Sequence, residues 1–195
     1  FKDVNGNTVE VPYEGWDREY ANNKDEYLKL FDNFMSQNNY ENCDQFENEF
    51  AQIIGRKYAV SVANATDALH FSLRSKNIGP GDEVLVTDFS WISTSSCISM
   101  VGATPVFCDV DLNNCHISLD SVKRMTSSKT RALIYTHLFG NMSDSTEIEQ
   151  YCKDNDIMLI EDAAQSLGSS IDNKKAGSIG DCSSFSFNSN KVISG

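Results

Sequence analysis

Short apolar runs rich in β-branched residues alternate with amphipathic stretches from residue 58 onward. An alternation of strands and helices favours βαβ units, in which helices cover both faces of a parallel sheet. We therefore expect an α/β fold with three layers and a mostly parallel central sheet. The pattern predicts strands at 58–62, 83–87, 104–110, 131–138, 157–161 and 182–187, and helices from Ala65 and over 92–101, 118–126 and 144–154.

The N-terminal part of the chain carries a weaker pattern. Residues 17–35 are predicted to be helical, and a second helix is expected to end at Gly55, because apolar residues recur there at every third or fourth position. The residues of this apolar stripe are Cys43, Phe46, Phe50 and Ile53. We expect an N-terminal helical segment over 1–40 and one larger domain over 41–195.

Composition and charge narrow the class of protein. A formal net charge of −12 disfavours a nucleic-acid partner, because neutralising phosphates requires a basic surface. No apolar run reaches the ~20 residues of a membrane span, so no membrane partner is expected. The six cysteines form no CxxC pair, which favours reduced thiols in a cytoplasmic protein. The first residue is not Met and the last closely follows Lys191, so we expect a piece of a longer protein.

Residues with useful chemistry follow several predicted strands. In an open α/β sheet, ligands bind beyond the carboxyl ends of the strands, so these residues should lie along one edge. The set comprises Ala65 and Thr66 at a helix start, the aromatic residues Phe89 and Trp91, His137, Asp162 with Gln165, and Lys191. The three histidines show no spacing typical of a metal site, and we expect no metal.

Each of these residues also has an ordinary structural interpretation. Asn64 or Thr66 could cap a helix instead of cradling a phosphate. Asp162 could cap a helix starting at Ala163. Trp91 could belong to the core, and a lone lysine such as Lys191 is usually a solvated surface residue, although a lysine at the rim of a pocket can form a Schiff base.

Several motifs in the right order resemble one family. They are "NATDALHFSL", "GPGDEVLVTDFSWISTSSCI", "GATPVFCDVD", "THLFGN", "IEDAAQSLGS" and "GSIGDCSSFSFNSNK". The set resembles the pyridoxal-phosphate (PLP)-dependent sugar aminotransferases of the DegT/DnrJ/EryC1/StrS family, which belong to fold type I of the aspartate aminotransferase superfamily. The resemblance runs from about Glu41 to Gly195. It implies that residues 41–195 form the PLP-binding large domain, and that the small C-terminal domain of the family is absent from this chain.

The resemblance assigns a role to each matching residue. Lys191 takes the place of the catalytic lysine that holds the cofactor covalently. Asp162 matches the carboxylate that faces the pyridine nitrogen, and Gln165 the amide near the ring hydroxyl. The remaining cofactor contacts it implies are Ala65, Thr66 and Ser186 at the phosphate and Trp91 on the ring face, and we add His137 and Phe89 as candidate substrate contacts.

The resemblance also implies a reaction. A ping-pong transamination would take an amino group from an amino acid, glutamate by family habit, and place it on a nucleotide-linked keto sugar. The loop "FNSNK" favours carbon 4 of a 4-keto-6-deoxy sugar over carbon 3. A homodimer with the active site at the subunit interface is expected. Residues 1–195 alone should be inactive, because the resemblance implies that they lack the part of the protein that completes the site. Two alternatives remain: a non-catalytic or regulatory nucleotide-sugar-binding member, and the sugar dehydratase branch, which Lys191 disfavours because that branch carries His there.

Overall fold

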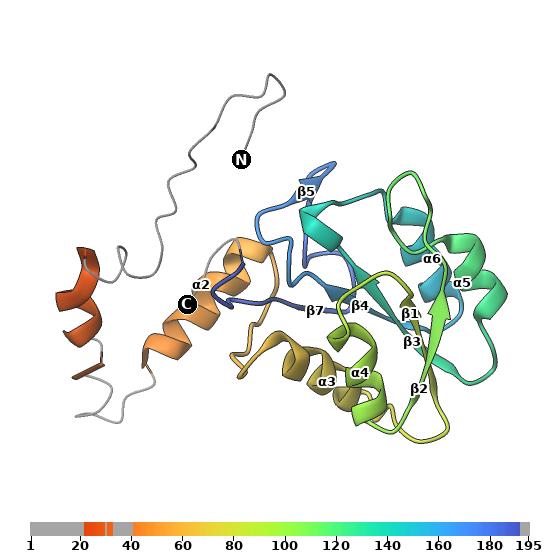
Figure 1. The fold of residues 1–195 in the computed structure, drawn as a ribbon, viewed down its shortest axis with the longest axis horizontal. Helices are drawn as coiled ribbons and strands as arrows, with labels where there is room; N and C mark the ends of the chain where they lie inside the picture. Colours follow the sequence, from red (N-terminus) through yellow and green to blue (C-terminus); the bar gives the residue numbers. More distant parts are fainter. Residues whose placement is uncertain (1–21, 30, 33–40, 192–195) are drawn as a thin grey trace, which may run out of the picture. The chain divides into compact units, whose positions relative to one another are not determined.

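The computed structural model describes residues 22–29, 31–32 and 41–191, which fall into two compact units divided between Phe46 and Glu47 (Figure 1). Residues 22–29 and 31–32 are helical, and the rest of the helix expected over 17–35 lies outside the described residues. Helix α2, Glu41–Ile54, spans the division. The domain boundary expected between residues 40 and 41 stays a prediction.

A five-stranded sheet forms the centre of the second unit, with the strand order β2-β1-β3-β4-β7. Every pair of neighbouring strands in this sheet is parallel. The strands are β1 (Glu83–Thr87), β2 (Thr104–Cys108), β3 (Thr130–Thr136), β4 (Met158–Asp162) and β7 (Cys182–Ser184). The α/β fold with a mostly parallel central sheet, predicted from the sequence, is therefore confirmed.

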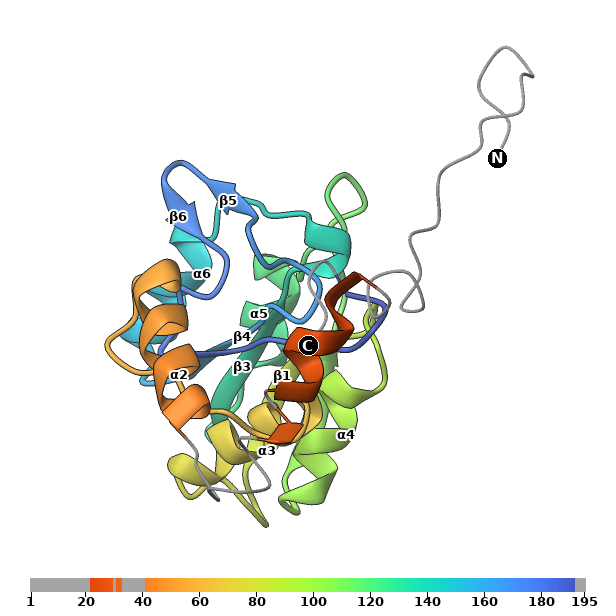
Figure 2. The same ribbon diagram turned by 90° about the vertical axis from the view of Figure 1, so that its left-hand side faces the viewer.

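Helices cover both faces of this sheet, as Figure 1 and Figure 2 show. One face carries α3 (Ala65–Ser75) and α4 (Ser93–Met100), and the other carries α5 (Leu119–Met125) and α6 (Thr146–Asp154). Each of the four helices was predicted from its amphipathic pattern.

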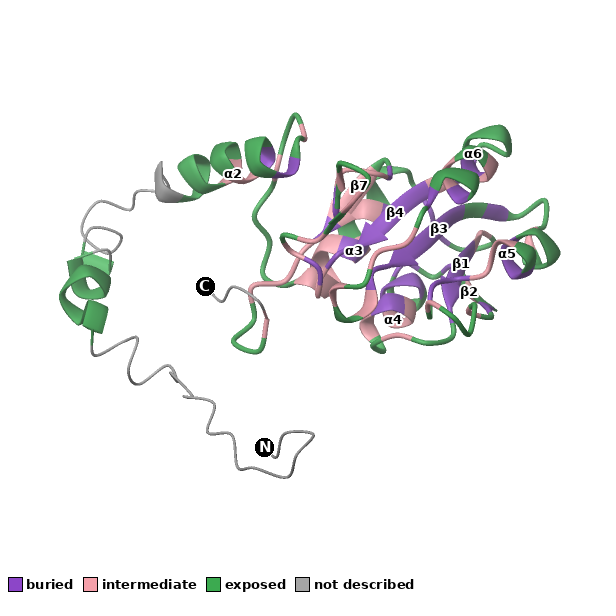
Figure 3. Ribbon diagram, turned by 90° about the horizontal axis from the view of Figure 1, so that it is seen from above, coloured by how far each residue is buried: buried purple, intermediate pink, exposed green. Residues whose placement is uncertain are grey.

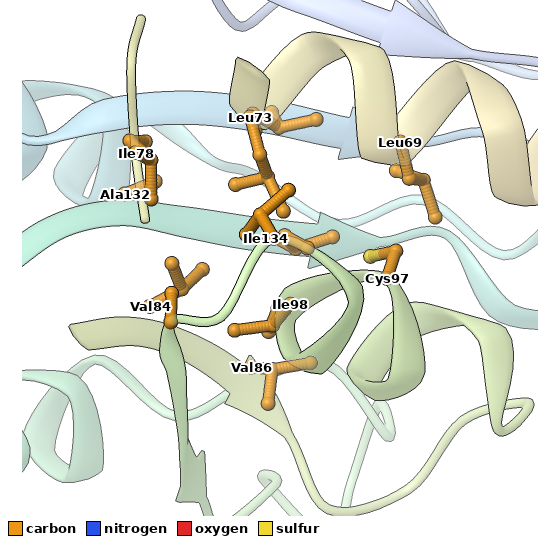
Figure 4. Close-up of a cluster of buried hydrophobic side chains, with 12 residues drawn as sticks. Leu69, Leu73, Ile78, Val84, Val86, Cys97, Ile98, Ala132 and Ile134 are labelled. Carbon is orange, nitrogen blue, oxygen red and sulfur yellow. The ribbon is translucent and has the colours of Figure 1, made fainter. Parts of the chain in front are cut away.

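Two apolar clusters lie between the sheet and its helices, one on each face. The side chains of Ile134 and Ile160 pack with α3 and α4, whereas those of Leu133 and Leu159 pack with α5 and α6 (Figure 4 for the first cluster). Successive residues of a strand point to opposite faces, so each buried strand supplies both clusters. The buried strands therefore read as continuous apolar runs, and Figure 3 shows β1, β3 and β4 buried over most of their length.

The segment 58–62, predicted as a strand, is not one. Its apolar side chains face outward, Tyr58 being 73% exposed and Val60 77% exposed, and the backbone N–H of Ser61 donates to the side chain of Glu47 rather than to a strand. Alternating apolar residues fit a strand only where a neighbour accepts the pairing, and in the described structure β7 pairs with β4 alone.

Other differences concern element ends and one exposed stripe. The strands expected to run to residues 110, 138 and 187 end at 108, 136 and 184. The hairpin of β5 (Ser170–Ile171) and β6 (Lys174–Lys175) and the 3-10 helix η1 (Leu138–Gly140) were not predicted. Helix α2 ends at Gly55 as expected, but Phe46 and Ile53 of its apolar stripe are exposed.

Candidate active site

A cavity of about 350 Å³ opens at the carboxyl ends of β3, β4 and β7. The cavity brings together residues that lie up to 127 positions apart in the sequence, from Asn64 to Lys191. The sequence-predicted residues that line it are Ala65, Thr66, Trp91, His137, Asp162, Gln165, Ser186 and Lys191. Phe89 is not among the lining residues; it is half exposed, and its backbone N–H donates to Thr87 Oγ1 at 3.1 Å.

The start of α3 forms one wall of the cavity. Asn64 caps this helix, because its side chain accepts a hydrogen bond from the N–H of Asp67 at 2.9 Å, so the capping interpretation is confirmed for Asn64. Thr66 Oγ1 donates to Ser93 Oγ at 2.9 Å, and Ser184 Oγ donates to the carbonyl of Ala65 at 3.1 Å. These bonds fix the helix start to α4 and β7, with its positive dipole end at the cavity.

Asp162 is the last residue of β4 and is 7% exposed. Thr94 Oγ1 donates to its Oδ2 at 2.8 Å, and the N–H of Ala164 donates to its Oδ1 at 3.2 Å. Burial raises the pKa of Asp162, although both hydrogen bonds and the charges of His137 and Lys191 act to lower it. No helix starts at Ala163, contrary to one interpretation of the sequence; residues 163–169 form turns instead.

Glu161 precedes Asp162 and points to the opposite face of the sheet, where it is fully buried. Its carboxylate accepts five hydrogen bonds, from His137 Nε2 at 3.0 Å, Arg56 Nη2 at 3.3 Å and the backbone N–H groups of Gly177, Ile179 and Gly180 at 2.8, 2.6 and 2.9 Å. Burial acts to raise the pKa of Glu161, but these bonds outweigh it and leave the pKa below its usual value. Glu161 therefore ties the 177–180 loop to the sheet.

His137 follows β3 and lies between this network and the cavity. Its ring is fully buried and bonded to Glu161 through Nε2, while Nδ1 has no hydrogen-bond partner within the described residues. The hydroxyl of Thr136, which also lines the cavity, is likewise buried and without a partner there. Thr136 pairs in register with Asp162, so a free hydroxyl sits beside the carboxylate.

The orientation of Gln165 is set by the backbone of Phe139. The N–H of Phe139 donates to Gln165 Oε1 at 2.8 Å, which leaves the amide nitrogen of Gln165 as its donor. Phe139 adopts a left-handed conformation, with φ at 56°, that non-glycine residues seldom take. Such strain persists only where the surrounding structure enforces it, and it is common at functional sites.

Lys191, Ser186 and Trp91 complete the rim of the cavity. Lys191 is half-buried and lies in a turn closed by its backbone N–H on the carbonyl of Asn188 at 2.9 Å. Ser186 Oγ accepts from the N–H of Asn188 at 3.4 Å. Trp91 is 70% exposed, so it does not belong to the core, and it lines the cavity.

Sequence reasoning missed Arg56, Ser90, Thr94 and Ser184. Arg56, Thr94 and Ser184 are ordinary polar residues whose partners lie at distant positions, so a single sequence gives no signal for them. Ser90 contacts Thr94 four residues later, and only this spacing indicates a contact. Among the residues that the structure describes, no group of three or more His, Cys, Asp or Glu side chains could hold a metal ion, and no helix combines the length and apolar character that crossing a bilayer requires.

Comparison with known proteins matches residues 19–195 to the model of the DegT/DnrJ/EryC1/StrS aminotransferase family. A GDP-perosamine synthase from Vibrio cholerae is 37% identical over 150 residues, which is 77% of this chain and 41% of that protein. A dTDP-3-amino-3,6-dideoxy-alpha-D-galactopyranose transaminase from Aneurinibacillus thermoaerophilus is 39% identical over 144 residues, 74% of this chain and 40% of that protein.

Solved structures agree with these relatives. An aminotransferase from Psychrobacter cryohalolentis superposes with a TM-score of 0.85 at 33% identity, over 95% of this chain and 47% of that one. The PLP-form of a putative sugar aminotransferase from Streptococcus pneumoniae superposes with a TM-score of 0.73 at 28% identity, over 77% of this chain and 42% of that one. The chain spans less than half the length of these proteins.

Proposed function

Because the chain belongs to the DegT/DnrJ/EryC1/StrS aminotransferase family, we propose that the protein uses pyridoxal phosphate to transfer an amino group to a keto sugar linked to a nucleotide. The observation that carries this proposal is the convergence of Lys191, Asp162 and the start of α3 on one cavity. An amine, a buried carboxylate and a helix N-terminus suit the three functional parts of this cofactor: its aldehyde, its ring nitrogen and its phosphate.

The residues of the cavity fit the cofactor. A phosphate suits the N-terminus of α3, where Ala65 leaves room and Thr66 and Ser186 add hydroxyl groups. The amide nitrogen of Gln165, left free to donate, suits an acceptor oxygen on the ring. The exposed ring of Trp91 suits stacking.

The proposed chemistry assigns each residue a task. When bound, PLP supplies an aldehyde that condenses with amines and a pyridinium ring that withdraws electrons. Asp162, held at its oxygens by Thr94 and Ala164, would place a negative charge at the ring nitrogen and so favour its protonated form. Lys191 would hold the cofactor covalently through Nζ, and the same amine, when free, would accept a proton from the α-carbon of the donor.

Finer features of the function are part of the same proposal. We favour glutamate as the amino donor because it is the usual donor in the family. We favour carbon 4 of a 4-keto-6-deoxy sugar as the acceptor because "FNSNK" resembles members of the family that aminate that carbon. The relatives include a 3-amino sugar transaminase by name, so carbon 3 is the outcome that would correct this choice. We also propose a cytoplasmic homodimer whose partner completes the site, with residues 41–195 as the large domain and His137 as a substrate contact.

The complete gene product tests the proposal directly. It should show the visible absorbance band of lysine-bound PLP, and glutamate should bleach this band. Incubation with glutamate and a panel of nucleotide-linked keto sugars should then give a product whose mass and NMR spectrum report an amine at one sugar carbon. A sugar that loses oxygen instead of gaining an amine would support the dehydratase alternative, and binding of a nucleotide sugar without any band would support the non-catalytic one.

Lys191→Ala separates the role of the lysine from that of the rest of the cavity. The variant should lose the band of lysine-bound PLP and at least ~10³-fold in turnover, because the cofactor anchor and the base are the same amine. Lys175→Ala is the matched control, since Lys175 is an exposed lysine outside the cavity. Full turnover by Lys191→Ala with an unchanged band would refute the assignment.

A further inference from the structure

Two hydroxyl groups connect the wall of the cavity to the carboxylate of Asp162. Ser90 Oγ lies 2.8 Å from Thr94 Oγ1, and Thr94 Oγ1 lies 2.8 Å from Asp162 Oδ2. We propose that Ser90 and Thr94 form a directional hydrogen-bonded chain that keeps Asp162 ionised and oriented, which makes Thr94 a positioning residue for the reaction. This inference rests on the proposed function only where it concerns the bound cofactor.

The direction of the chain follows from the number of hydrogens. An ionised carboxylate can only accept, and a threonine hydroxyl has a single hydrogen to give. Thr94 therefore donates to Asp162, and Ser90 must donate to Thr94. Ser90 lines the cavity, so its remaining lone pairs are available to a bound ligand. Protonation of Asp162 would remove the reason for this direction, because the acid could then donate to Thr94.

Burial makes the inner bond of this chain important. Thr94 is 1% exposed and Asp162 is 7% exposed, so little bulk water reaches this bond, and the neighbouring hydroxyl of Thr136 makes no hydrogen bond in the described structure. The next turn of α4 supplies only the apolar and fully buried Cys97 and Ile98. The second donor to Asp162, the N–H of Ala164, is more distant at 3.2 Å. A hydrogen bond to a charged group that is withdrawn from water is worth more than one between neutral groups.

The groups around Asp162 agree with an ionised carboxylate. His137 after β3 and Lys191 after β7 both favour its negative charge, while burial opposes it and raises its pKa. Cys97 on α4 stays a neutral thiol, with a pKa raised to about 12 by burial and by the charge of Asp162. Glu161 is next in sequence but points to the other face of the sheet, where its charge is compensated by its own donors. Of the two hydrogen bonds to Asp162 described above, the one from Thr94 is the shorter.

The test compares three variants of the complete protein with wild type. Thr94→Val keeps the shape of the side chain and removes the hydroxyl, Thr94→Ser keeps the hydroxyl, and Ser90→Ala removes only the outer donor. Thr126→Val is the control, because Thr126 Oγ1 also donates a short bond, 2.7 Å to the carbonyl of Val122, but lies outside the cavity. Thr94→Val should bind PLP about 10- to 100-fold more weakly, Ser90→Ala about threefold, and Thr94→Ser within about threefold of wild type.

A second measurement needs no cofactor. The thermal stability of each apoprotein is followed from pH 8 to pH 4. The hydroxyl of Thr94 stabilises the ionised form of Asp162, so the loss of stability in Thr94→Val should be largest at pH 8 and should shrink as Asp162 becomes protonated. A loss caused by packing alone would be the same at every pH. Thr126→Val should show such a constant loss.

The outcomes separate this inference from the proposed function. If the protein binds no PLP, the proposed function fails while the pH dependence of the apoprotein still tests the chain. Thr94→Val with wild-type affinity and a pH-independent loss would overturn the inference, and so would equal losses in Thr94→Ser and Thr94→Val. If Thr94→Val does not fold, Ser90→Ala decides: its loss of stability must also shrink toward pH 4, and a constant loss overturns the chain.

Discussion

Replacing Glu161 by glutamine should cost about 3 kcal/mol of folding free energy while leaving the shape of the side chain unchanged. Glutamine keeps one acceptor oxygen, which would stay at the Oε1 position, where Arg56 and two N–H groups donate. The amide nitrogen then replaces Oε2 and faces the N–H of Gly177, formerly bonded at 2.8 Å. A buried donor without a partner costs about 1–3 kcal/mol.

The lost charge adds to this cost. Arg56 and His137 would lose their ionised partner, and removing one member of a buried charged pair costs about 3–5 kcal/mol. Because the side chain of Arg56 is 26% exposed, water compensates part of that loss. The total loss of folding free energy should therefore lie near the lower end of this range, at about 3 kcal/mol. Urea denaturation of the complete apoprotein measures this free energy, provided the transitions of wild type and variant have the same slope.

The dependence on pH identifies the source of the loss. The pKa of Glu161 is lowered in the folded state, so the ionised carboxylate contributes its stability fully above the unfolded pKa, near 4.5, and loses it as the pH falls through the folded pKa. The difference between wild type and Glu161→Gln should therefore narrow as the pH falls below about 4.5.

A matched control is Glu149→Gln, which breaks the partly exposed pair between Glu149 and Lys174 at 2.7 Å and should cost under about 1 kcal/mol. Equal losses in the two variants, or a loss in Glu161→Gln that does not change with pH, would refute the reasoning.

Two further predictions concern packing and thiol chemistry. Gly177→Ala should lower the free energy of unfolding, measured in urea, by about 2–4 kcal/mol, because φ is +89° and a Cβ would overlap the ring of Phe185. The control Gly81→Ala has φ at +96° but open space around the Cβ, and should cost only about 1 kcal/mol. Equal costs would show that Phe185 moves aside easily. In native protein at pH 8, iodoacetamide should label the exposed Cys43 long before the buried Cys97, because burial raises the pKa of the Cys97 thiol to about 12. Timed quenching followed by peptide mass spectrometry measures the order of labelling, and labelling of Cys97 first would contradict this prediction.

The fold was predictable where the local pattern and the tertiary contacts agree. The run 84–86 is apolar because β1 is covered on both faces, and the helix from Ala65 is amphipathic because α3 covers one face of the sheet. The run 58–62 has the same kind of pattern, but Tyr58 and Val60 face outward in the described structure. Its apolar character alone therefore led to the wrong prediction of a strand. Strand order was not predictable, because it depends on contacts between distant segments.

The site was predictable to the extent that its residues follow strands directly. Asp162, Gln165 and Lys191 were found because parallel strands end at one edge and because their motifs resemble a family. The residues that hold them were not found. Thr94 and Arg56 act through partners 68 and 105 positions away in the chain, and no local pattern marks such pairs.

The adjacent carboxylates at the end of β4 place an unusual constraint on how this sequence can vary. Glu161 secures a loop on one face of the sheet and Asp162 serves the cavity on the other, so the pleat of the strand alone separates the two tasks. Inserting or deleting one residue within β4 would exchange their faces, presenting Glu161 to the cavity and leaving the loop without its anchor. Homologues should therefore tolerate insertions at the exposed tip of the β5–β6 hairpin, around Asp172 and Asn173, while the length of β4 stays unchanged.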